Sequence, residues 1–393
     1  MEQQKEKKRK VSKRQRSTQS QSFPRDLTSE ILLTLPEKSV ARFRCVSKLW
    51  LSITTDPYFI NVFKNRYRGL SLLICFIEDD KLFVSSIPQH QHSLQNSKRS
   101  YSCSQPIYRY HMEFPEGQSN FPPTKSVQGL ICFNVSATPI VWNPSTRQLL
   151  TLTKPRLSWN DIAIFLGYDP VEGIHKVMCI PLKRSSDVCR VLTLGSAQEQ
   201  EPWRTVKTCH KHRSEYHTTS GRCIKGVVYY IAYVYHKRVW VIMSFDVRYE
   251  KFDMMQLPSE NISRVMMTYE GRLACVENCV TKYGKLIRKH GTRLYILEDA
   301  KKHKWLSKVV LAPGACFDDR LKIYYQLNGY THDGEFVYVS STFDKKGYIL
   351  FCDPLRNSFR RFELKGIAEG VLKSRMYALY AFPNHVESQI TLK

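Results

Sequence analysis

The feature that most constrains this chain is a turn that recurs at nearly constant spacing through residues 67–393. Asp246, Asp299 and Asp353 each follow a short apolar run and lie 53 and 54 residues apart. Asn143 precedes Asp246 by 103 residues, about twice that spacing, and Asp169 follows Asn143 by 26, about half of it. Asp and Asn favour turns because their side chains hydrogen-bond the nearby backbone. The repeated turn therefore predicts a repeating β architecture.

The segments between these turns have the composition of strands. β-branched and aromatic runs alternate with Gly, Pro, Asn and Asp, and helical periodicity is scarce. A period near ~50 residues is typical of kelch-type propeller blades, small antiparallel sheets that must stack around an axis to bury both faces. At that period residues 67–393 allow about six blades. Four strands are expected to open at a glycine: Gly129–Phe133, Gly226–Tyr230, Gly271–Val276 and Gly334–Val339.

Residues 22–66 have a different, helical pattern. Pro24 suits a helix entry, Asp26 an N-cap, and Pro36 and Asp56-Pro57 suit helix ends. Three short amphipathic helices are predicted, with a core so small that a remaining apolar face would form a partner surface. Their apolar positions are Leu27, Ile31, Leu32 and Leu35, then Val40, Phe43 and Val46, then Leu49, Trp50 and Ile53 after the N-cap Ser47.

Two stretches of this sequence resemble known domains. Residues 35–50 read Leu-Pro-Glu-Lys-Ser-Val-Ala-Arg-Phe-Arg-Cys-Val-Ser-Lys-Leu-Trp, and together with residues 23–34 they resemble the plant form of the F-box. Ala41 departs from that pattern, which more often has a larger residue there. Further on, the sequence resembles the F-box-associated domain of plant F-box proteins at Gly129–Phe133, Val141–Gln148 and Gly167–Pro170, and more weakly at Phe351–Pro354. The tail and roughly residues 78–124 fall outside both resemblances.

The resemblance implies an α+β multidomain fold, a small three-helix F-box followed by a mainly antiparallel all-β domain, a β-propeller. It also implies a function. The F-box would dock a Skp-type adaptor and, through it, a cullin, and the β domain would bind a protein target for ubiquitination. The chain would be a non-catalytic receptor subunit of this SCF-type ligase and would supply proximity. The residues expected at the adaptor surface, some of which must also hold the helices together, are Pro24, Leu27, Ile31, Leu35, Pro36, Val40, Arg42, Val46 and Trp50.

The predicted parts are a disordered basic tail (1–21), the F-box (22–66) and the β domain (67–393). The tail is almost wholly Lys, Arg, Gln and Ser. Its run Lys7, Lys8, Arg9 and Lys10 resembles a nuclear import signal. The expected location is therefore the nucleus, the cytoplasm or both.

The charge balance supports an alternative function. Lys and Arg number 60 against 35 Asp and Glu, a net charge of +25, which could attract nucleic acid. The alternatives are thus a nuclear nucleic-acid-binding protein or a scaffold outside any ligase. Tyrosines could stack on bases, although blade filling explains them better. They are Tyr229, Tyr230, Tyr233, Tyr235, Tyr324 and Tyr325, interleaved with Lys237, Arg238 and Lys322.

The sequence predicts no catalytic, metal or cofactor site. It lacks a Gly-x-Ser-x-Gly elbow, a phosphate-binding Gly-x4-Gly-Lys-[Ser/Thr] loop and a His-Glu-x-x-His motif. The twelve cysteines form no Cys-x-x-Cys pair and are expected to be reduced and mostly buried. No spanning segment or signal peptide is expected, so no membrane partner is either. One Cys/His group matches no zinc spacing and lies in Lys207–Arg222, which is expected to be an exposed loop: Cys209, His210, His212, His217 and Cys223.

Overall fold

The computed structural model divides the chain into two compact units, residues 1–68 and 69–393. No helix in the described part is long and apolar enough to cross a membrane. The residues described are 24–34, 40, 43, 45–56, 59, 70–78, 81–88, 107–114, 123–195, 203–214, 221–277, 291–318, 323–340, 342–343, 347–364, 377–388 and 390–392.

The first unit contains two described helices, α1 (Arg25–Thr34) and α3 (Lys48–Thr55). Ser47 caps α3 as expected, because its Oγ accepts a hydrogen bond from the Trp50 backbone N–H at 3.1 Å. Asp26 lies in the first turn of α1 instead of capping it, where its charge favours the helix dipole. Three helices were expected. Only two are found in the described residues, because most of the stretch between α1 and α3 lies outside them.

A small apolar cluster holds this unit together. Leu32, Val40, Ile53 and Phe59 are buried, and Leu33, Phe43 and Trp50 pack against them. The Phe43 and Trp50 rings meet edge to face with their centroids 5.0 Å apart. So few buried side chains give limited stabilisation, as the sequence predicted.

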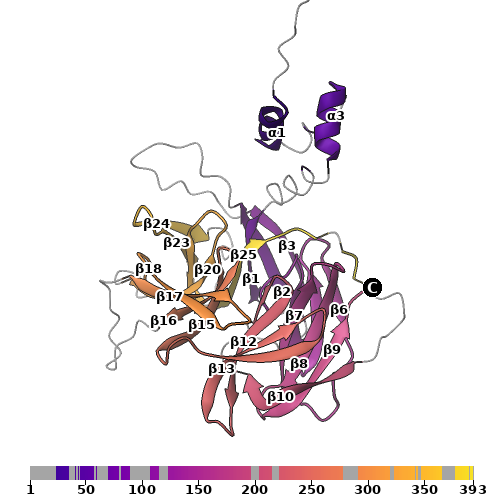
Figure 1. Cartoon of the computed structure of the whole chain (residues 1–393), viewed down its shortest axis with the longest axis vertical. Coiled ribbons are helices and arrows are strands. Elements are labelled where there is room, and N and C mark those ends of the chain that lie inside the picture. The colour runs from indigo at the N-terminus through magenta and orange to yellow at the C-terminus, as the bar shows by residue number, and fades with distance from the viewer. Residues whose placement is uncertain are drawn as a thin grey trace, which may run out of the picture. The chain divides into compact units, whose positions relative to one another are not determined.

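The second unit is mainly β and has a propeller-like arrangement of antiparallel sheets (Figure 1). The first sheet has the order β22-β25-β1-β2-β3, so it joins strands from both ends of the unit. The second has the order β4-β5-β6. Their strands are β1 (Ser71–Glu78), β2 (Lys81–Pro88), β3 (Ile107–Glu113), β22 (Thr342–Phe343), β25 (Tyr377–His385), β4 (Ile131–Val135), β5 (Thr138–Asn143) and β6 (Gln148–Thr151).

The largest sheet has the order β14-β13-β12-β10-β9-β8-β7, and β11 pairs with β12. It joins two successive meanders, because Arg213 and Ser214 of β10 pair with Tyr233 and Ala232 of β12. The described strands therefore form five sheets, although the repeat spacing allowed about six blades. The strands are β7 (Ile162–Asp169), β8 (Ile174–Pro181), β9 (Ser186–Thr193), β10 (Arg204–Ser214), β11 (Arg222–Ile224), β12 (Val227–Val234), β13 (Val239–Asp246) and β14 (Lys251–Gln256).

The last two sheets have the orders β15-β16-β17-β18 and β19-β20-β21-β23-β24. Each hydrophobic cluster of the β unit draws on two meanders that follow one another, and one cluster joins the last sheet to the first. The strands are β15 (Ile262–Tyr269), β16 (Arg272–Glu277), β17 (Thr292–Asp299), β18 (Lys304–Val310), β19 (Ala315–Asp318), β20 (Ile323–Tyr330), β21 (Phe336–Ser340), β23 (Gly347–Asp353) and β24 (Ser358–Leu364).

The repeated turn is the same structure at all five positions. In each, the Oδ1 of the Asn or Asp accepts the backbone N–H groups two and three residues later, at 2.8–3.4 Å. The residue four positions on has a positive φ between 46° and 73°. These carboxylates therefore serve turn geometry, as the sequence predicted. The turns start at Asn143, Asp169, Asp246, Asp299 and Asp353.

The last strand closes the β unit on the first. Along β25 and β1, His385 pairs with Ser71 and Tyr380 with Cys75. The chain then continues along the turn between β5 and β6, where Asn143 Nδ2 donates to the carbonyls of Ser388 (3.2 Å) and Ile390 (2.7 Å). We call residues 384–388 and 390–392 the C-terminal clasp.

Further contacts of the clasp explain the residues that resemble the F-box-associated domain. Ser388 N–H donates to Ser145 Oγ and Leu392 N–H to Gln148 Oε1, both at 3.0 Å. Gly129 has φ +86°, and a Cβ there would lie 2.5 Å from the Ser388 Cβ. Only glycine combines that backbone conformation with so close an approach. The residues of this motif thus bind the C-terminal clasp.

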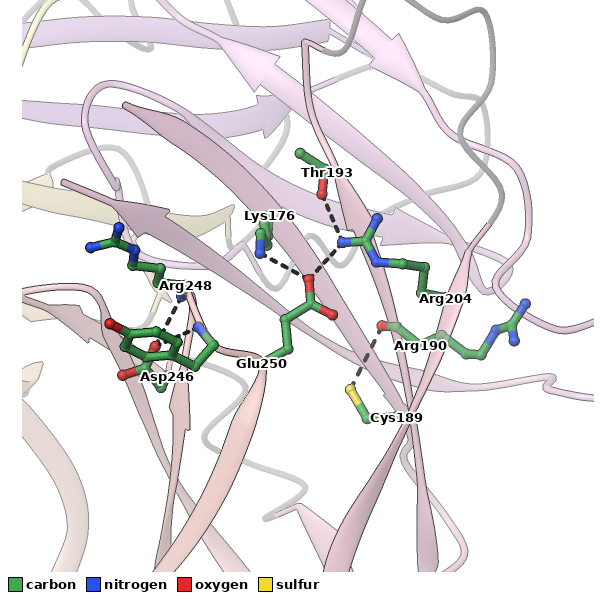
Figure 2. A network of polar contacts seen from close by, with 9 residues as sticks. Lys176, Cys189, Arg190, Thr193, Arg204, Asp246, Arg248 and Glu250 are labelled. Atoms are coloured by element: carbon green, nitrogen blue, oxygen red, sulfur yellow. Dashed lines mark hydrogen bonds and ion pairs between the residues drawn. The ribbon is translucent and has the colours of Figure 1, made fainter. Parts of the chain in front are cut away.

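An ion-pair cluster links β8, β10 and the turn between β13 and β14 (Figure 2). Glu250 Oε1 lies 2.8 Å from Lys176 Nζ and 2.6 Å from Arg204 Nη2, and Arg204 also donates to Thr193 Oγ1. The side chains of Lys176 and Glu250 are only 9% and 20% exposed. Burial alone would raise the pKa of Glu250, but the hydrogen bonds and charges of Arg204 and Lys176 outweigh it and lower this pKa below its ordinary 4.5.

Asn143→Ala is expected to destabilise the β unit by about 2–4 kcal/mol, because it removes a turn cap and deprives the buried Ser388 carbonyl and the Ile390 carbonyl of this donor. Asp299→Ala is the matched control, since its turn has the same bonds near the surface and no clasp contact; a loss of about 1 kcal/mol is expected. Urea unfolding measures both. Equal losses would mean that the clasp adds nothing to stability.

Glu250→Gln is expected to lower stability by about 2 kcal/mol at pH 7, because it leaves Lys176 buried without its countercharge. Since the folded pKa is lowered, this contribution is present above pH 4.5 and is lost as pH falls through the folded value. Unfolding curves of wild type and variant should therefore converge at acidic pH. Glu298→Gln, whose partner Lys304 is 68% exposed, should leave stability nearly unchanged. A difference between wild type and Glu250→Gln that stays constant as the pH falls well below 4.5 would contradict this account.

Candidate docking surface of the helical unit and cavities of the β unit

Helix α1 separates its apolar residues onto two faces. Leu32 is fully buried, whereas Leu27 and Ile31 are 49% and 48% exposed. Leu27 and Ile31 are four residues apart and therefore neighbours on the helix surface. Two large aliphatic side chains thus lie side by side on the exposed surface of the described helical unit.

Helix α3 and the turn before it add to the exposed apolar residues. Val46, Leu49 and Leu51 are exposed, whereas Ile53 is buried. The Arg25 and Asp56 side chains lie 3.5 Å apart, and both are well exposed. Such a surface ion pair adds little stability, so the apolar cluster around Leu32 must hold the helices together. We call Leu27, Ile31, Val46, Leu49 and Leu51 the apolar docking patch.

The structure sorts the predicted adaptor residues into three groups. Pro24, Leu27, Ile31 and Val46 are exposed. Val40 is buried and Trp50 packs against the cluster, so both hold the unit together. Leu35, Pro36 and Arg42 lie outside the described residues. Sequence reasoning missed Leu49 and Leu51 as surface residues, because the apolar residues of the eight-residue α3 did not reveal which face is buried.

The β unit has a cavity of about 600 Å³ between β15, β18, β20 and the β23–β24 turn. Lys308 Nζ donates to Tyr269 OH at 2.9 Å and lies 3.7 Å from Glu270 Oε1. Burial, followed by the nearby Tyr269 and Glu270, raises the pKa of Tyr330 to about 12, so this phenol stays protonated at neutral pH. Exposed apolar residues also line the cavity: Val309, Leu311 and Leu355. The cavity thus offers both apolar contact and charges of both signs.

A second, smaller cavity of about 170 Å³ lies where β11, β15, β20, β25 and the segment before β4 converge. Its lining includes two cationic side chains, Lys125 and Arg222. Lys125 Nζ donates to Asn328 Oδ1 at 3.2 Å. No local pattern in the sequence pointed to this cavity, because its cations are 97 residues apart and meet only through the ring of strands.

The Cys/His group does not form a metal site in the described residues. The expectation of an exposed loop over Lys207–Arg222 was wrong for its first part, since β10 runs through Ser214. Thr208, His212 and Ser214 are buried there, and His212 bonds the Tyr230 hydroxyl at 2.7 Å and the His210 carbonyl at 2.7 Å. Cys223 Sγ accepts from the Tyr168 N–H at 3.3 Å, and His217 lies outside the described residues.

The structure also shows where the predicted tyrosines and cysteines lie. Tyr229, Tyr230 and Tyr325 are buried and fill the sheets, whereas Tyr235 and Tyr324 are exposed. Of the cysteines whose side chains are described, six are buried, and burial raises the pKa of these thiols. The predicted import residues Lys7, Lys8, Arg9 and Lys10 lie outside the described part of the chain.

Comparison with known proteins agrees with this architecture. Residues 21–61 match the F-box domain family, and residues 71–386 match the F-box associated beta propeller domain family. Among solved structures, a chain in "Crystal Structure of Mitotic Checkpoint Complex" matches 64% of this chain over 73% of that chain's length, with 12% sequence identity. The TM-score of 0.34 is too low to carry an argument.

Whole-length relatives are found in Arabidopsis thaliana. The F-box protein At1g47765 is 61% identical, and the F-box protein At3g10240 is 57% identical; in each comparison 100% of both chains is covered. The F-box protein At1g48060 is 36% identical, with 94% of this chain and 93% of that protein covered. The chain therefore belongs to the family of plant F-box proteins that carry an F-box associated β-propeller domain.

Proposed function

We propose that this protein is the substrate-recognition subunit of an SCF-type ubiquitin ligase. The observation that carries the proposal is the apolar docking patch, whose five large aliphatic side chains are exposed although Leu32, Val40, Ile53 and Phe59 of the same unit are buried. Large aliphatic side chains exposed together on a small unit are typical of a protein interface. In this proposal the patch binds a Skp-type adaptor, which connects the chain to a cullin.

The β unit holds the target protein in this proposal. The pairing of β25 with β1 closes its ring. The unit is therefore a rigid support for turns that can differ between relatives. Its larger cavity, with exposed Val309, Leu311 and Leu355 beside Lys308 and Glu270, suits contact with a protein segment. The chain itself performs no bond chemistry, and it contributes proximity between the target and a ubiquitin-charged enzyme.

The double variant Leu27→Ala/Ile31→Ala is expected to weaken adaptor binding by about 3 kcal/mol, roughly a hundredfold in Kd, because it truncates two neighbouring anchors. Calorimetric titration of the full chain with purified Skp-type adaptor measures this. The matched control is Leu157→Ala/Val171→Ala, which truncates two exposed aliphatic residues of the β unit (89% and 69% exposed) and should leave the Kd unchanged. Wild-type affinity in a double variant with an unchanged unfolding transition would overturn the assignment.

The ligase role needs a second measurement, because a scaffold would also bind the adaptor. Ubiquitin transfer to the chain itself, reconstituted with adaptor, cullin and charged enzyme, should occur with wild type and fail with Leu27→Ala/Ile31→Ala. Adaptor binding without any transfer would favour the scaffold.

We also propose that the basic run Lys7-Lys8-Arg9-Lys10 directs nuclear import. Its closely spaced positive charges suit the acidic surface of an import receptor. Replacing all four with Ala is expected to move a fluorescent fusion of the chain from the nucleus to the cytoplasm. Replacing Lys81, Lys211, Lys251 and Lys302, four described lysines of the β unit, is the charge-matched control and should leave the fusion nuclear. An unchanged nuclear signal in the first variant would refute the proposal.

A further inference from the structure

Three aromatic side chains lie together at one end of the β12–β13 hairpin. Tyr233 and Tyr235 are two residues apart at the end of β12, so their side chains point to the same face. Trp240 of β13 pairs with Tyr233 and shares that face. The centroid of the Tyr233 ring is 5.0 Å from that of Trp240 and 4.9 Å from that of Tyr235. The three rings therefore form one continuous cluster.

This cluster reaches the surface at its outer end. Residues 235–239 are all exposed, and Tyr235 is 46% exposed. Tyr233 and Trp240 are half-buried, whereas Tyr229, four residues earlier on the same face of β12, is buried. The aromatic face of β12 therefore changes along the strand from a part of the core to a surface that a partner can contact.

An arginine from the neighbouring strand lies against the cluster. Arg213 of β10 pairs with Tyr233, and its guanidinium carbon is 5.5 Å from the centroid of the Tyr235 ring. This distance is typical of a cation–π contact. A guanidinium group also stacks on planar rings and binds phosphate through two hydrogen bonds. The strand pairing therefore places a cation suited to phosphate directly beside the rings.

Positive charge predominates in the strands that carry the cluster. Lys237 and Arg238 are exposed in the β12–β13 turn. Strand β10 and residues 227–245 contain no Asp or Glu. Lys211 of β10 is a poorer phosphate ligand than these two, because the strand register puts Asp187 of β9 near it. The exposed end of the hairpin thus combines aromatic rings with cations.

Two histidines show that the turn lies close to β10. The ring centroids of His210 on β10 and His236 in the turn are 5.5 Å apart. Partial burial, followed by the nearby Lys237 and His236, lowers the pKa of His210 below its ordinary 6.5. The positive groups of the turn therefore act on β10 as well as on their own strand.

A second exposed tyrosine of the same hairpin shows what distinguishes this end. Tyr249 is 64% exposed, and the guanidinium carbon of Arg248 is 5.6 Å from its ring centroid. It follows the opposite end of β13, about 25 Å away along the strand, and lies between the carboxylates of Asp246 and Glu250 in sequence. Both ends thus have an exposed tyrosine beside an arginine, but the Tyr249 end is flanked by acids.

We propose that the exposed end of the β12–β13 hairpin binds single-stranded nucleic acid. Aromatic rings stack on the bases of a single strand, while Arg and Lys side chains bind its phosphates. The net charge of +25 would attract such a polyanion to the protein. We call this site the stacking patch, and its members are Tyr233, Tyr235, Trp240, Arg213, Lys237 and Arg238. It uses no residue of the helical unit and goes beyond the ligase proposal.

An acidic protein segment is another polyanion that the cations of the stacking patch could attract. The rings favour nucleic acid, because carboxylates gain nothing from stacking. Each base stacked on an aromatic side chain strengthens binding roughly tenfold or more. A duplex is disfavoured as well, since its bases already stack on one another.

The first test replaces the most exposed ring. Tyr235→Ala is expected to weaken binding of the full chain to a fluorescent thymidylate strand of about ten nucleotides by about tenfold, measured by anisotropy. Tyr249→Ala is the matched control and should bind as wild type does. The affinity for a duplex of the same length should be equal in Tyr235→Ala and wild type. An unchanged affinity of Tyr235→Ala for the single strand, or an equal loss for the duplex, would overturn the stacking patch.

Photochemical cross-linking separates the stacking patch from the basic tail. Residues 1–21 contain no Phe, Tyr or Trp, so a cross-link to an aromatic side chain cannot come from the tail. A single strand that carries iodouracil should cross-link to Tyr233, Tyr235 or Trp240, because these rings stack on its bases. Cross-links confined to other residues would contradict the proposal.

The cations are tested through the salt dependence of binding. Lys237→Gln/Arg238→Asn should reduce the slope of log Kd against log salt by about 1.4, since each phosphate contact on a single strand contributes about 0.7. Asn suits position 238, where φ is 54°. The matched control Lys225→Asn/Lys251→Gln removes two exposed lysines, one of them at a φ of 49°, and should keep the slope. An unchanged slope in the first variant would show that these cations bind no phosphate.

A polyglutamate peptide of about ten residues tests the competing partner. It should bind the full chain more weakly than the thymidylate strand, and Tyr235→Ala should not change its affinity. Tighter binding of the peptide, lost in Tyr235→Ala, would overturn the proposal in favour of an acidic protein segment. None of these outcomes alters adaptor binding by the apolar docking patch, so the two proposals fail separately.

Discussion

The pairing of β25 with β1 is the interaction on which the β unit depends. Each meander buries its apolar faces against its neighbours, so the ring is complete only when the last sheet meets the first. That contact joins residues about 300 positions apart, and loop-closure entropy opposes it. The clasp adds hydrogen bonds at this junction: it accepts two from Asn143 and donates backbone N–H groups to Ser145 and Gln148. A local motif therefore stabilises a strand pairing between residues more than 300 positions apart in the sequence.

The two units differ in how much of their apolar surface they bury. In the described residues the β unit buries most of its large apolar side chains around the closed ring, whereas the small helical unit buries four in one cluster and leaves five exposed: Leu27, Ile31, Val46, Leu49 and Leu51. A unit with so small a core gains stability from a partner that covers its surface. Under the proposed function, the exposed apolar side chains of the helical unit would be covered by the adaptor, while the closed ring of the β unit would bind the target.

The sequence predicted those parts of the structure that local chemistry determines. Spacing of Asn143, Asp246, Asp299 and Asp353 identified the repeated turn, because an Asx side chain binds its own backbone. The burial of residues by contacts with distant parts of the sequence could not be predicted. Because β10 is polar, the sequence suggested a loop there. His212 is nevertheless buried, since it bonds the hydroxyl of Tyr230, which lies 18 residues away. Val40 and Leu49 look alike in sequence, and only packing shows that one is core and the other surface. Lys125 and Arg222 carry no local signal, since the ring alone brings them together.

The clasp also protects the molecule from self-association. The unpaired edge of a β-strand presents backbone N–H and C=O groups that a second chain can pair with. In the closed ring β25 lies between β22 and β1, so both of its edges are paired. Loss of the bonds from Asn143 to the Ser388 and Ile390 carbonyls would favour opening at this junction and would expose the edges of β1 and β25. A weakened clasp would therefore promote edge-to-edge aggregation as well as unfolding.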